Sequence, residues 1–117
     1  MKQIRFAVAI ALAVPVLAFA QAATPRVDQR QAAQEQRIEQ GAASGSLTQR
    51  ETNRLERGQQ RVDNMENRAK ADGVVTRRER AGLHRVQDRQ SERIYAQKHD
   101  RQHDFNHNGR IDRLRRR

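Results

Sequence analysis

The sequence contains no cysteine and no tryptophan, and its aromatic side chains are three Phe and one Tyr. Without cysteine the chain has no disulfide bond, no thiol nucleophile and no thiol for lipid attachment after export. With so few aromatic rings it also offers no platform on which nucleic-acid bases could stack. These absences argue against a disulfide scaffold, a thiol enzyme and a nucleic-acid reader.

Long apolar runs are also scarce, and the one that exists lies at the N-terminus. Lys2 and Arg5 precede an apolar run from Phe6 to Ala20 that ends in Ala18-Phe19-Ala20. A charged start, an apolar stretch and an A-x-A ending are typical of a secretory signal peptide. The run is too short for a comfortable membrane span, and no second run follows it. We therefore expect residues 1–20 to be removed near Ala20, leaving a periplasmic or secreted protein without a stable membrane span.

Large aliphatic side chains are few in the remaining chain. Residues 21–117 carry 22 Lys+Arg against 14 Asp+Glu, a net charge of +8. Only fifteen of these residues are Val, Ile, Leu, Met, Phe or Tyr, a composition close to that of disordered chains. We expect a marginal core, stabilised by helix propensity, by narrow helix seams, or by a partner such as a second copy in a homodimer.

The pattern that is present is helical. Thr24-Pro25 resembles a helix start, and the helix formers that follow extend to Gln40, before the loop Gly41–Ser46. A second helix is predicted from Thr48, which can form a capping box with Glu51, to about Asp72-Gly73.

A third helix is predicted from a second capping box, Thr76 with Glu79, to about Gln102. The expected apolar seams are Leu55, Val62, Met65 and Ala69 in the second helix, and Leu83, Val86, Ile94 and Tyr95 in the third. Gly58, Gly82 and Gln90 interrupt these seams. No segment alternates like a strand, so the class is all-α, with about three helices joined by short Gly-containing loops. Residues 24–103 form the helical region, and residues 104–117 form a loop and basic tail.

The residues Asp104 to Asp112 resemble the calcium-binding loop of the EF-hand family, which implies an EF-hand-like helix-loop-helix arrangement at this end of the chain. The resemblance assigns oxygen ligands to loop positions one, three, five, seven and nine, which here are Asp104, Asn106, Asn108, the carbonyl of Arg110, and Asp112. Gly109 falls at position six, where the family makes a sharp turn, and Ile111 at the apolar position eight. Arg115 stands where the family has a bidentate Glu, so Ca²⁺ should bind weakly, with a dissociation constant on the order of 10⁻³ M. The alternative is a polar turn in the tail.

Two earlier segments, Ser44–Glu51 and Asp72–Glu79, repeat the second half of this loop pattern. Their first halves lack oxygen ligands, so neither should bind calcium. A glycine C-cap followed by a capping box is also how any antiparallel helix pair can be joined.

The histidines offer a weaker metal set. His99 and His103 are four residues apart, a spacing that places two imidazoles on one face of a helix, and His107 follows in the loop. Such a set could bind copper, nickel or zinc. The alternative is that all three are solvated polar side chains.

Arginine dominates the cations and falls into two stripes at helical spacing. The stripes are Arg50, Arg54, Arg57 and Arg61 in the second helix, and Arg78, Arg85, Arg89 and Arg93 in the third. Because Arg pairs bidentately with phosphate and carboxylate, anionic polymers or lipid head groups are expected partners. The alternative is a solvated face neutralised by pairs such as Glu66 with Lys70.

No enzyme is expected, because Ser44, Ser46 and Ser91 lie in no recognisable catalytic motif. The Gly-x-Leu-Thr-x-x-Glu segment that starts at Gly45 resembles that of a loose group of small exported proteobacterial proteins. The segment also looks similar to the Leu-Thr-x-x-Gln repeats of a periplasmic chaperone family. The sequence thus predicts a small exported helical protein that binds a metal ion, calcium, or serves as a structural envelope component. Its alternatives are a periplasmic stress chaperone or adaptor and a cationic binder of anionic lipid or polymer.

Overall fold

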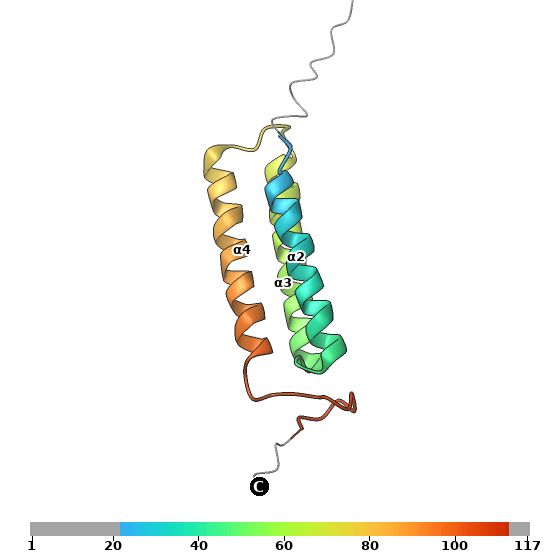
Figure 1. Ribbon diagram of the computed structural model, residues 1–117. Helices are drawn as coiled ribbons and strands as arrows, with labels where there is room; N and C mark the ends of the chain where they lie inside the picture. The colour runs from blue at the N-terminus through green and yellow to red at the C-terminus, as the bar shows by residue number, and fades with distance from the viewer. Residues whose placement is uncertain (1–21, 113–117) are drawn as a thin grey trace, which may run out of the picture.

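The computed structural model describes residues 22–112, and within them the chain forms three helices and no strand. The helices are α2 (Pro25–Ser44), α3 (Gln49–Lys70) and α4 (Arg77–Lys98). In the view of Figure 1 they run down, up and down beside one another, and each packs against the other two. The all-α prediction with three helices is confirmed. The expected signal peptide and Arg115 lie outside the described residues.

Both predicted capping boxes are present. The Thr48 amide donates to Oε2 of Glu51 at 2.8 Å, and the Glu51 amide donates back to the Thr48 hydroxyl at 3.4 Å. At the start of α4, the corresponding bonds between Thr76 and Glu79 measure 2.8 and 3.2 Å. Each box satisfies donors that the first turn of a helix leaves free.

The predicted end of the first helix was wrong, because α2 continues through Gly41 to Ser44. The chain turns instead at Gly45, whose φ of 73° is left-handed. Leu47 folds back over Gly41, so that a Cβ there would lie 2.6 Å from Cδ1 of Leu47. Gly41 therefore makes room for the Leu47 side chain against α2, and the helix continues past it.

The predicted end of the third helix was also wrong, because α4 ends at Lys98 and not near Gln102. Beyond that point, Oδ1 of Asp100 accepts the amide of Gln102 at 2.7 Å. A short acidic side chain that bonds the backbone two residues ahead competes with helical hydrogen bonding. The second helix ends at Lys70, shortly before the predicted Asp72-Gly73.

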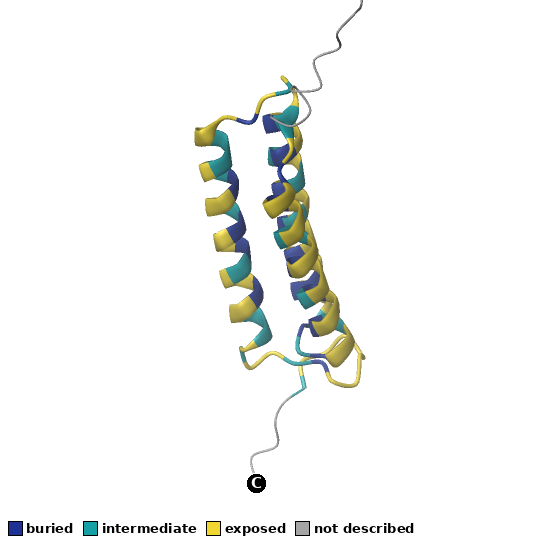
Figure 2. Ribbon diagram, turned by 45° about the horizontal axis from the view of Figure 1, so that its top comes forward, coloured by how far each residue is buried: buried dark blue, intermediate teal, exposed yellow. Residues whose placement is uncertain are grey.

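The apolar core is divided between the two ends of the bundle. One cluster comprises Val27, Ala69, Val75 and Leu83, and the other comprises Ile38, Leu47, Leu55 and Ile94. Figure 2 shows the buried residues on the inward sides of the helices. Tyr95, expected in the seam, is 63% exposed, whereas Gln90, expected to interrupt it, is 2% exposed. Leu83, Gln87, Gln90 and Ile94 are spaced four, three and four residues apart, so the seam is a regular one with glutamine in two places.

The buried glutamines connect the helices through their side-chain amides. Gln34 of α2 donates to the carbonyl of Gln87 at 2.8 Å, and Gln87 of α4 donates to that of Val27 at 2.9 Å. Gln90 of α4 donates to the carbonyl of Leu55 in α3 at 2.9 Å. Glutamine thus links α2 to α4 in both directions, and α4 to α3, in the part of the bundle that the aliphatic clusters leave open.

Candidate functional site

The segment after α4 crosses beneath the bundle to the turn between α2 and α3 (Figure 1). The amide of Asp104 donates to the carbonyl of Gly45 at 2.9 Å, and Nε2 of His107 lies 3.1 Å from the carbonyl of Ala42. A Cβ at Gly45 would lie 2.5 Å from the carbonyl oxygen of Asp104 and 2.6 Å from Cα of Phe105. The missing side chain of Gly45 therefore lets the two backbones meet.

Asp104 organises the loop that follows. It is only 5% exposed, and its two carboxylate oxygens accept different amides: Oδ1 that of Asn108 at 3.0 Å, and Oδ2 that of Gly109 at 2.9 Å. Gly109 has a φ of 76°. The loop therefore turns sharply around the Asp104 carboxylate at the residue that the EF-hand resemblance placed in position six.

The other expected side-chain ligands lie in the same folded loop. Oδ1 of Asn106 accepts the Asn108 amide at 3.1 Å, and Oδ1 of Asn108 accepts the Arg110 amide at 2.8 Å. Asp112 closes the loop, because its carboxylate accepts the Phe105 amide at 2.7 Å and the Asn106 side-chain amide at 2.8 Å.

These oxygens are of the kind that calcium prefers. Oδ1 of Asp104 and Oδ1 of Asn106 both accept the Asn108 amide, so they converge from two predicted ligand positions. Each such oxygen has a second lone pair. Asp104 and Asp112 are the only carboxylates among the expected ligands. Within residues 22–112 no group of three or more His, Asp or Glu side chains is placed to hold a metal ion. Weak Ca²⁺ binding by this set therefore stays a prediction.

The structure does not bring His99, His103 and His107 together on one helical face. Because α4 ends at Lys98, the helical spacing argument does not apply. Nδ1 of His99 lies 2.7 Å from the carbonyl of Tyr95, with the two rings stacked. His103 stacks on Phe105, with ring centroids 4.8 Å apart, while His107 contacts α2. The transition-metal set stays a prediction that this arrangement does not favour.

A second candidate site is a groove of about 380 Å³ between α3 and α4. Its cationic lining comes from both helices, with Arg61 and Arg68 on α3 and Arg89 and Arg93 on α4. Met65 and Val86 add apolar surface, and no Asp or Glu lines the groove. The groove thus takes Arg61 from the predicted α3 stripe and Arg89 and Arg93 from the predicted α4 stripe, and the other members of the two stripes are not among its lining residues. Arg68 was missed from the sequence, although its seven-residue spacing from Arg61 places it on the same side of the helix.

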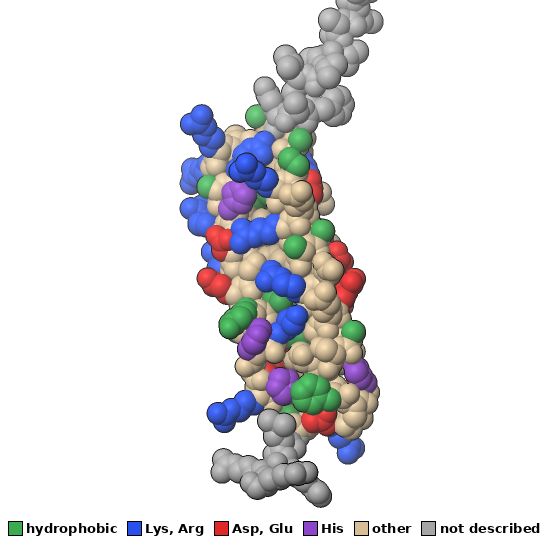
Figure 3. All heavy atoms as spheres, viewed as in Figure 1, with side chains coloured by type: hydrophobic (Ala, Val, Ile, Leu, Met, Phe, Trp, Pro, Cys, Tyr) green, Lys and Arg blue, Asp and Glu red, His purple; other side chains and the backbone are tan. Residues whose placement is uncertain are grey.

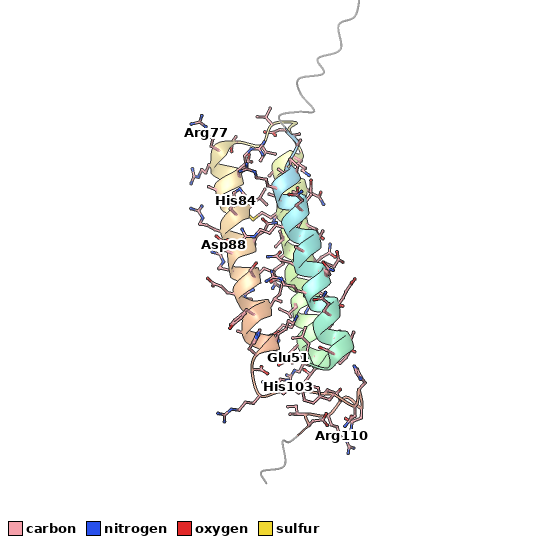
Figure 4. All side chains as sticks on the ribbon, in the orientation of Figure 1. Glu51, Arg77, His84, Asp88, His103 and Arg110 are labelled. Carbon is pink, nitrogen blue, oxygen red and sulfur yellow. The ribbon has the colours of Figure 1, made fainter. Side chains whose placement is uncertain are left out.

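The ion pairs of the described region lie elsewhere. Arg30 of α2 pairs with Asp88 of α4, and Lys70 pairs with Glu66 at 2.6 Å and with Asp28 at 3.7 Å. The predicted pair of Glu66 with Lys70 is thus present. Within residues 22–112 no ion pair involves the arginines of the α3–α4 groove. Figure 3 shows Lys and Arg side chains gathered along the α4 side of the face it presents, and Figure 4 shows the side chains of both ends of the bundle.

The acids near Lys70 form a separate titratable cluster. Burial and the neighbouring charge of Glu66 raise the pKa of Asp28 and of Asp63. Burial also acts to raise the pKa of Glu66, but hydrogen bonds from Lys70 and Thr24 outweigh it, and the pKa of Glu66 falls below 4.5. The Thr24 hydroxyl, expected to cap α2, makes no cap and donates to Glu66 instead. Lys70 and the Thr24 hydroxyl thus connect Glu66 of α3 to the start of α2.

The chain matches no family model, and comparison with the curated proteins and with the solved structures finds no match. None of the helices in residues 22–112 is long and apolar enough to cross a membrane.

Proposed function

We propose that this is a small exported structural protein whose C-terminal loop binds calcium weakly. The observation that carries the proposal is the convergence of Asp104 and Asn106 oxygens on the Asn108 amide, within a loop that Asp112 closes. In EF-hand loops, side-chain oxygens at positions one, three and five bind the ion and a glycine at position six makes a sharp turn.

Calcium bound here would act on the bundle as well as on the loop. The Asp104 carboxylate accepts the Gly109 amide within the loop, and the Asp104 amide donates to the carbonyl of Gly45. A divalent cation would offset the charges of Asp104 and Asp112 and so hold the loop against the α2–α3 turn. The expected affinity lies at the weak end of the range for extracellular calcium modules, which suits the export predicted from residues 1–20.

The second candidate function is a periplasmic stress adaptor that binds apolar segments of a client. The observation that favours it is the exposure of Tyr95, Phe105 and Ile111, at 63%, 52% and 52%, in the last turns of α4 and the loop after it. Suppression of client aggregation by the protein, and its loss in a Tyr95→Ser, Ile111→Ser variant, would support this function over calcium binding.

The calcium proposal is tested by following the backbone amide signals of Asn108 and Gly109 during titration of residues 21–117 with Ca²⁺, and with Mg²⁺ for comparison. We expect a dissociation constant for Ca²⁺ on the order of 10⁻³ M and weaker binding of Mg²⁺, which demands a more regular octahedral site. Asp112→Asn should weaken Ca²⁺ binding. Asp72→Asn is the matched control, because Asp72 accepts the amide of Val74 in a similar turn at the far end of the bundle.

The same titration of Arg115→Glu tests the loop assignment from sequence. Restoring a carboxylate at position twelve should tighten Ca²⁺ binding at least tenfold, about 1.4 kcal/mol. If Arg115→Glu shows no shift of the Gly109 amide with Ca²⁺, or if the shift persists in Asp112→Asn with unchanged affinity, the metal assignment is wrong.

A further inference from the structure

The α3–α4 groove runs lengthwise between two helices whose register is fixed by close contacts. A Cβ at Gly58 of α3 would lie 2.3 Å from Oε1 of Gln90 in α4, and a Cβ at Gly82 of α4 would lie 3.0 Å from Cε of Met65 in α3. These two contacts place the middle of α3 beside the middle of α4, in antiparallel order. Arg61 and Arg68 of α3 and Arg89 and Arg93 of α4 therefore lie on the two walls of the same groove.

Each stripe extends well beyond a single binding contact. Arg61 and Arg68 line the groove from α3, and Arg57 and Arg54 continue the same side of that helix beyond the groove lining, so that the row covers roughly 21 Å at 1.5 Å per residue. Arg89 and Arg93 line the groove from α4, and Arg85 precedes them by one turn, so that this row covers roughly 12 Å. A row of cations of this length matches a chain-like ligand better than one isolated phosphate or carboxylate.

The electrostatics of the groove call for an anionic occupant. Packed helix axes lie about 8–10 Å apart, which is close to the screening length of about 8 Å at physiological ionic strength, so facing arginines at the groove repel one another. No acidic side chain lines the groove to offset this repulsion. An anion between the two stripes would be attracted by both, and guanidinium groups can bind it bidentately.

The remaining lining argues for a sugar chain among the linear anions. Met65 and Val86 provide apolar contact, while the exposed Asn64 provides a carboxamide. Such a mixture suits sugar rings, which carry both hydroxyls and C–H faces. A polyphosphate chain has no apolar surface with which to contact Met65 and Val86. A groove between two adjacent helices also admits one extended chain and not a nucleic-acid duplex.

A membrane surface fits this face less well. Membrane-surface helices bury large apolar side chains next to their basic residues. The exposed Tyr95 of α4 follows Arg93 by two residues, or 200° around the helix, and so faces away from the groove. Met65 and Val86 are half-buried in the groove itself. We propose that the α3–α4 groove binds a linear acidic polysaccharide, with its carboxylate or phosphate groups between the two arginine stripes.

The test measures binding of residues 21–117 to a linear polyuronate oligomer of about eight sugars, at low and at physiological salt. Arg61→Gln, Arg89→Gln removes one cation from each wall of the groove. The matched control, Arg26→Gln, Arg101→Gln, removes the same charge at two exposed positions away from the groove. We expect the groove variant to bind at least tenfold more weakly than the unaltered protein, and the control to stay within about twofold. Helix content by circular dichroism checks that both variants fold.

Competition identifies the occupant. Inorganic polyphosphate of equal charge, a single-stranded oligonucleotide and vesicles of anionic phospholipid should each compete less well than the polyuronate. An equal loss of affinity in the groove and control variants, or stronger binding to polyphosphate, oligonucleotide or vesicles, would overturn the proposal. Arg61 and Arg89 lie near the middle of α3 and α4, whereas the C-terminal loop contacts Gly45 at one end of the bundle. The groove variant should therefore retain its Ca²⁺ response, so the failure of one proposal would not imply the failure of the other.

Discussion

Gly58 and Gln90 show how one missing side chain can determine a buried contact. Glycine inside a helix costs about 1 kcal/mol relative to Ala. Here that cost makes room for the Gln90 carboxamide, which reaches the Leu55 carbonyl at 2.9 Å and would lie 2.3 Å from any Cβ at position 58. The same pairing explains why Gln90 is buried in the seam that it was expected to interrupt.

We predict that the effect of Gly58→Ala on the free energy of unfolding changes sign with residue 90. In the unaltered protein it should destabilise by about 1 kcal/mol, because displacing the carboxamide leaves buried polar groups unpaired and outweighs the gain in helix propensity. In a Gln90→Ala background it should stabilise by up to about 1 kcal/mol. Urea unfolding of the four variants of this double-mutant cycle measures the coupling.

Gly82→Ala is the matched control for that cycle. Its Cβ would meet only the terminal carbon of half-buried Met65, at 3.0 Å, and this flexible group can move. We expect Gly82→Ala to be neutral or stabilising. Destabilisation by both glycine substitutions would show that the Gln90 bond is not the cause.

At the scale of the helix, the two capping boxes differ in burial although their sequences are alike. Glu51 is 4% exposed, whereas Thr76 and its partner Glu79 lie nearer the solvent. We predict that Thr76→Ala lowers stability by about 1 kcal/mol and Thr48→Ala by more, up to about 2 kcal/mol, because Thr48→Ala also removes a donor to a buried carboxylate. Thermal melts of both variants make the comparison, with Thr48→Ser and Thr76→Ser expected to restore stability. Equal melts for Thr48→Ala and the unaltered protein would contradict this role of the box.

The starts of the helices could be predicted from sequence because a capping box involves residues only three positions apart. Their ends and seams depend on contacts with distant residues. Gly41 stays helical because Leu47 covers it, and Thr24 bonds Glu66 from another helix in place of its own first turn. Nothing in the local sequence of Gln87 or Gln90 distinguishes a buried glutamine from a solvated one, since only the facing carbonyls of α2 and α3 make burial favourable.

The candidate sites also combine local features, which the sequence predicts, with contacts between distant residues, which it does not. The turn around Asp104 could be predicted because its ligand pattern spans nine residues, whereas its docking on Gly45 involves residues 59 positions apart. The arginine stripes could be found from their spacing, but their position along one groove requires the register of α3 and α4. The three histidines do not converge because their prediction required α4 to continue to about Gln102. The helix ends at Lys98, and beyond it the Asp100 side chain accepts the Gln102 amide.

At the scale of the whole molecule, Gly45 and Gly73 allow the docking of the C-terminal loop to be tested. Both have left-handed φ values, 73° and 82°, but a Cβ at Gly73 would meet nothing within 4 Å, whereas one at Gly45 would collide with the backbone of the loop. We predict that Gly73→Ala costs about 1 kcal/mol from backbone strain alone, and that Gly45→Ala costs at least about 1 kcal/mol more. Hydrogen exchange should show lost protection of the Asp104 amide only in Gly45→Ala. Retained protection there would mean that the loop does not depend on this contact.

The bond from the Asp104 amide to the Gly45 carbonyl also sets an order of assembly. Gly45 presents its carbonyl in this direction only once α2 has ended and the chain has turned into α3. The contact joins residues 59 positions apart, and pairings so distant in sequence are slow to form by chain diffusion. The α2–α3 turn therefore has to form before the loop can dock on it, and any opening of that turn also releases the loop.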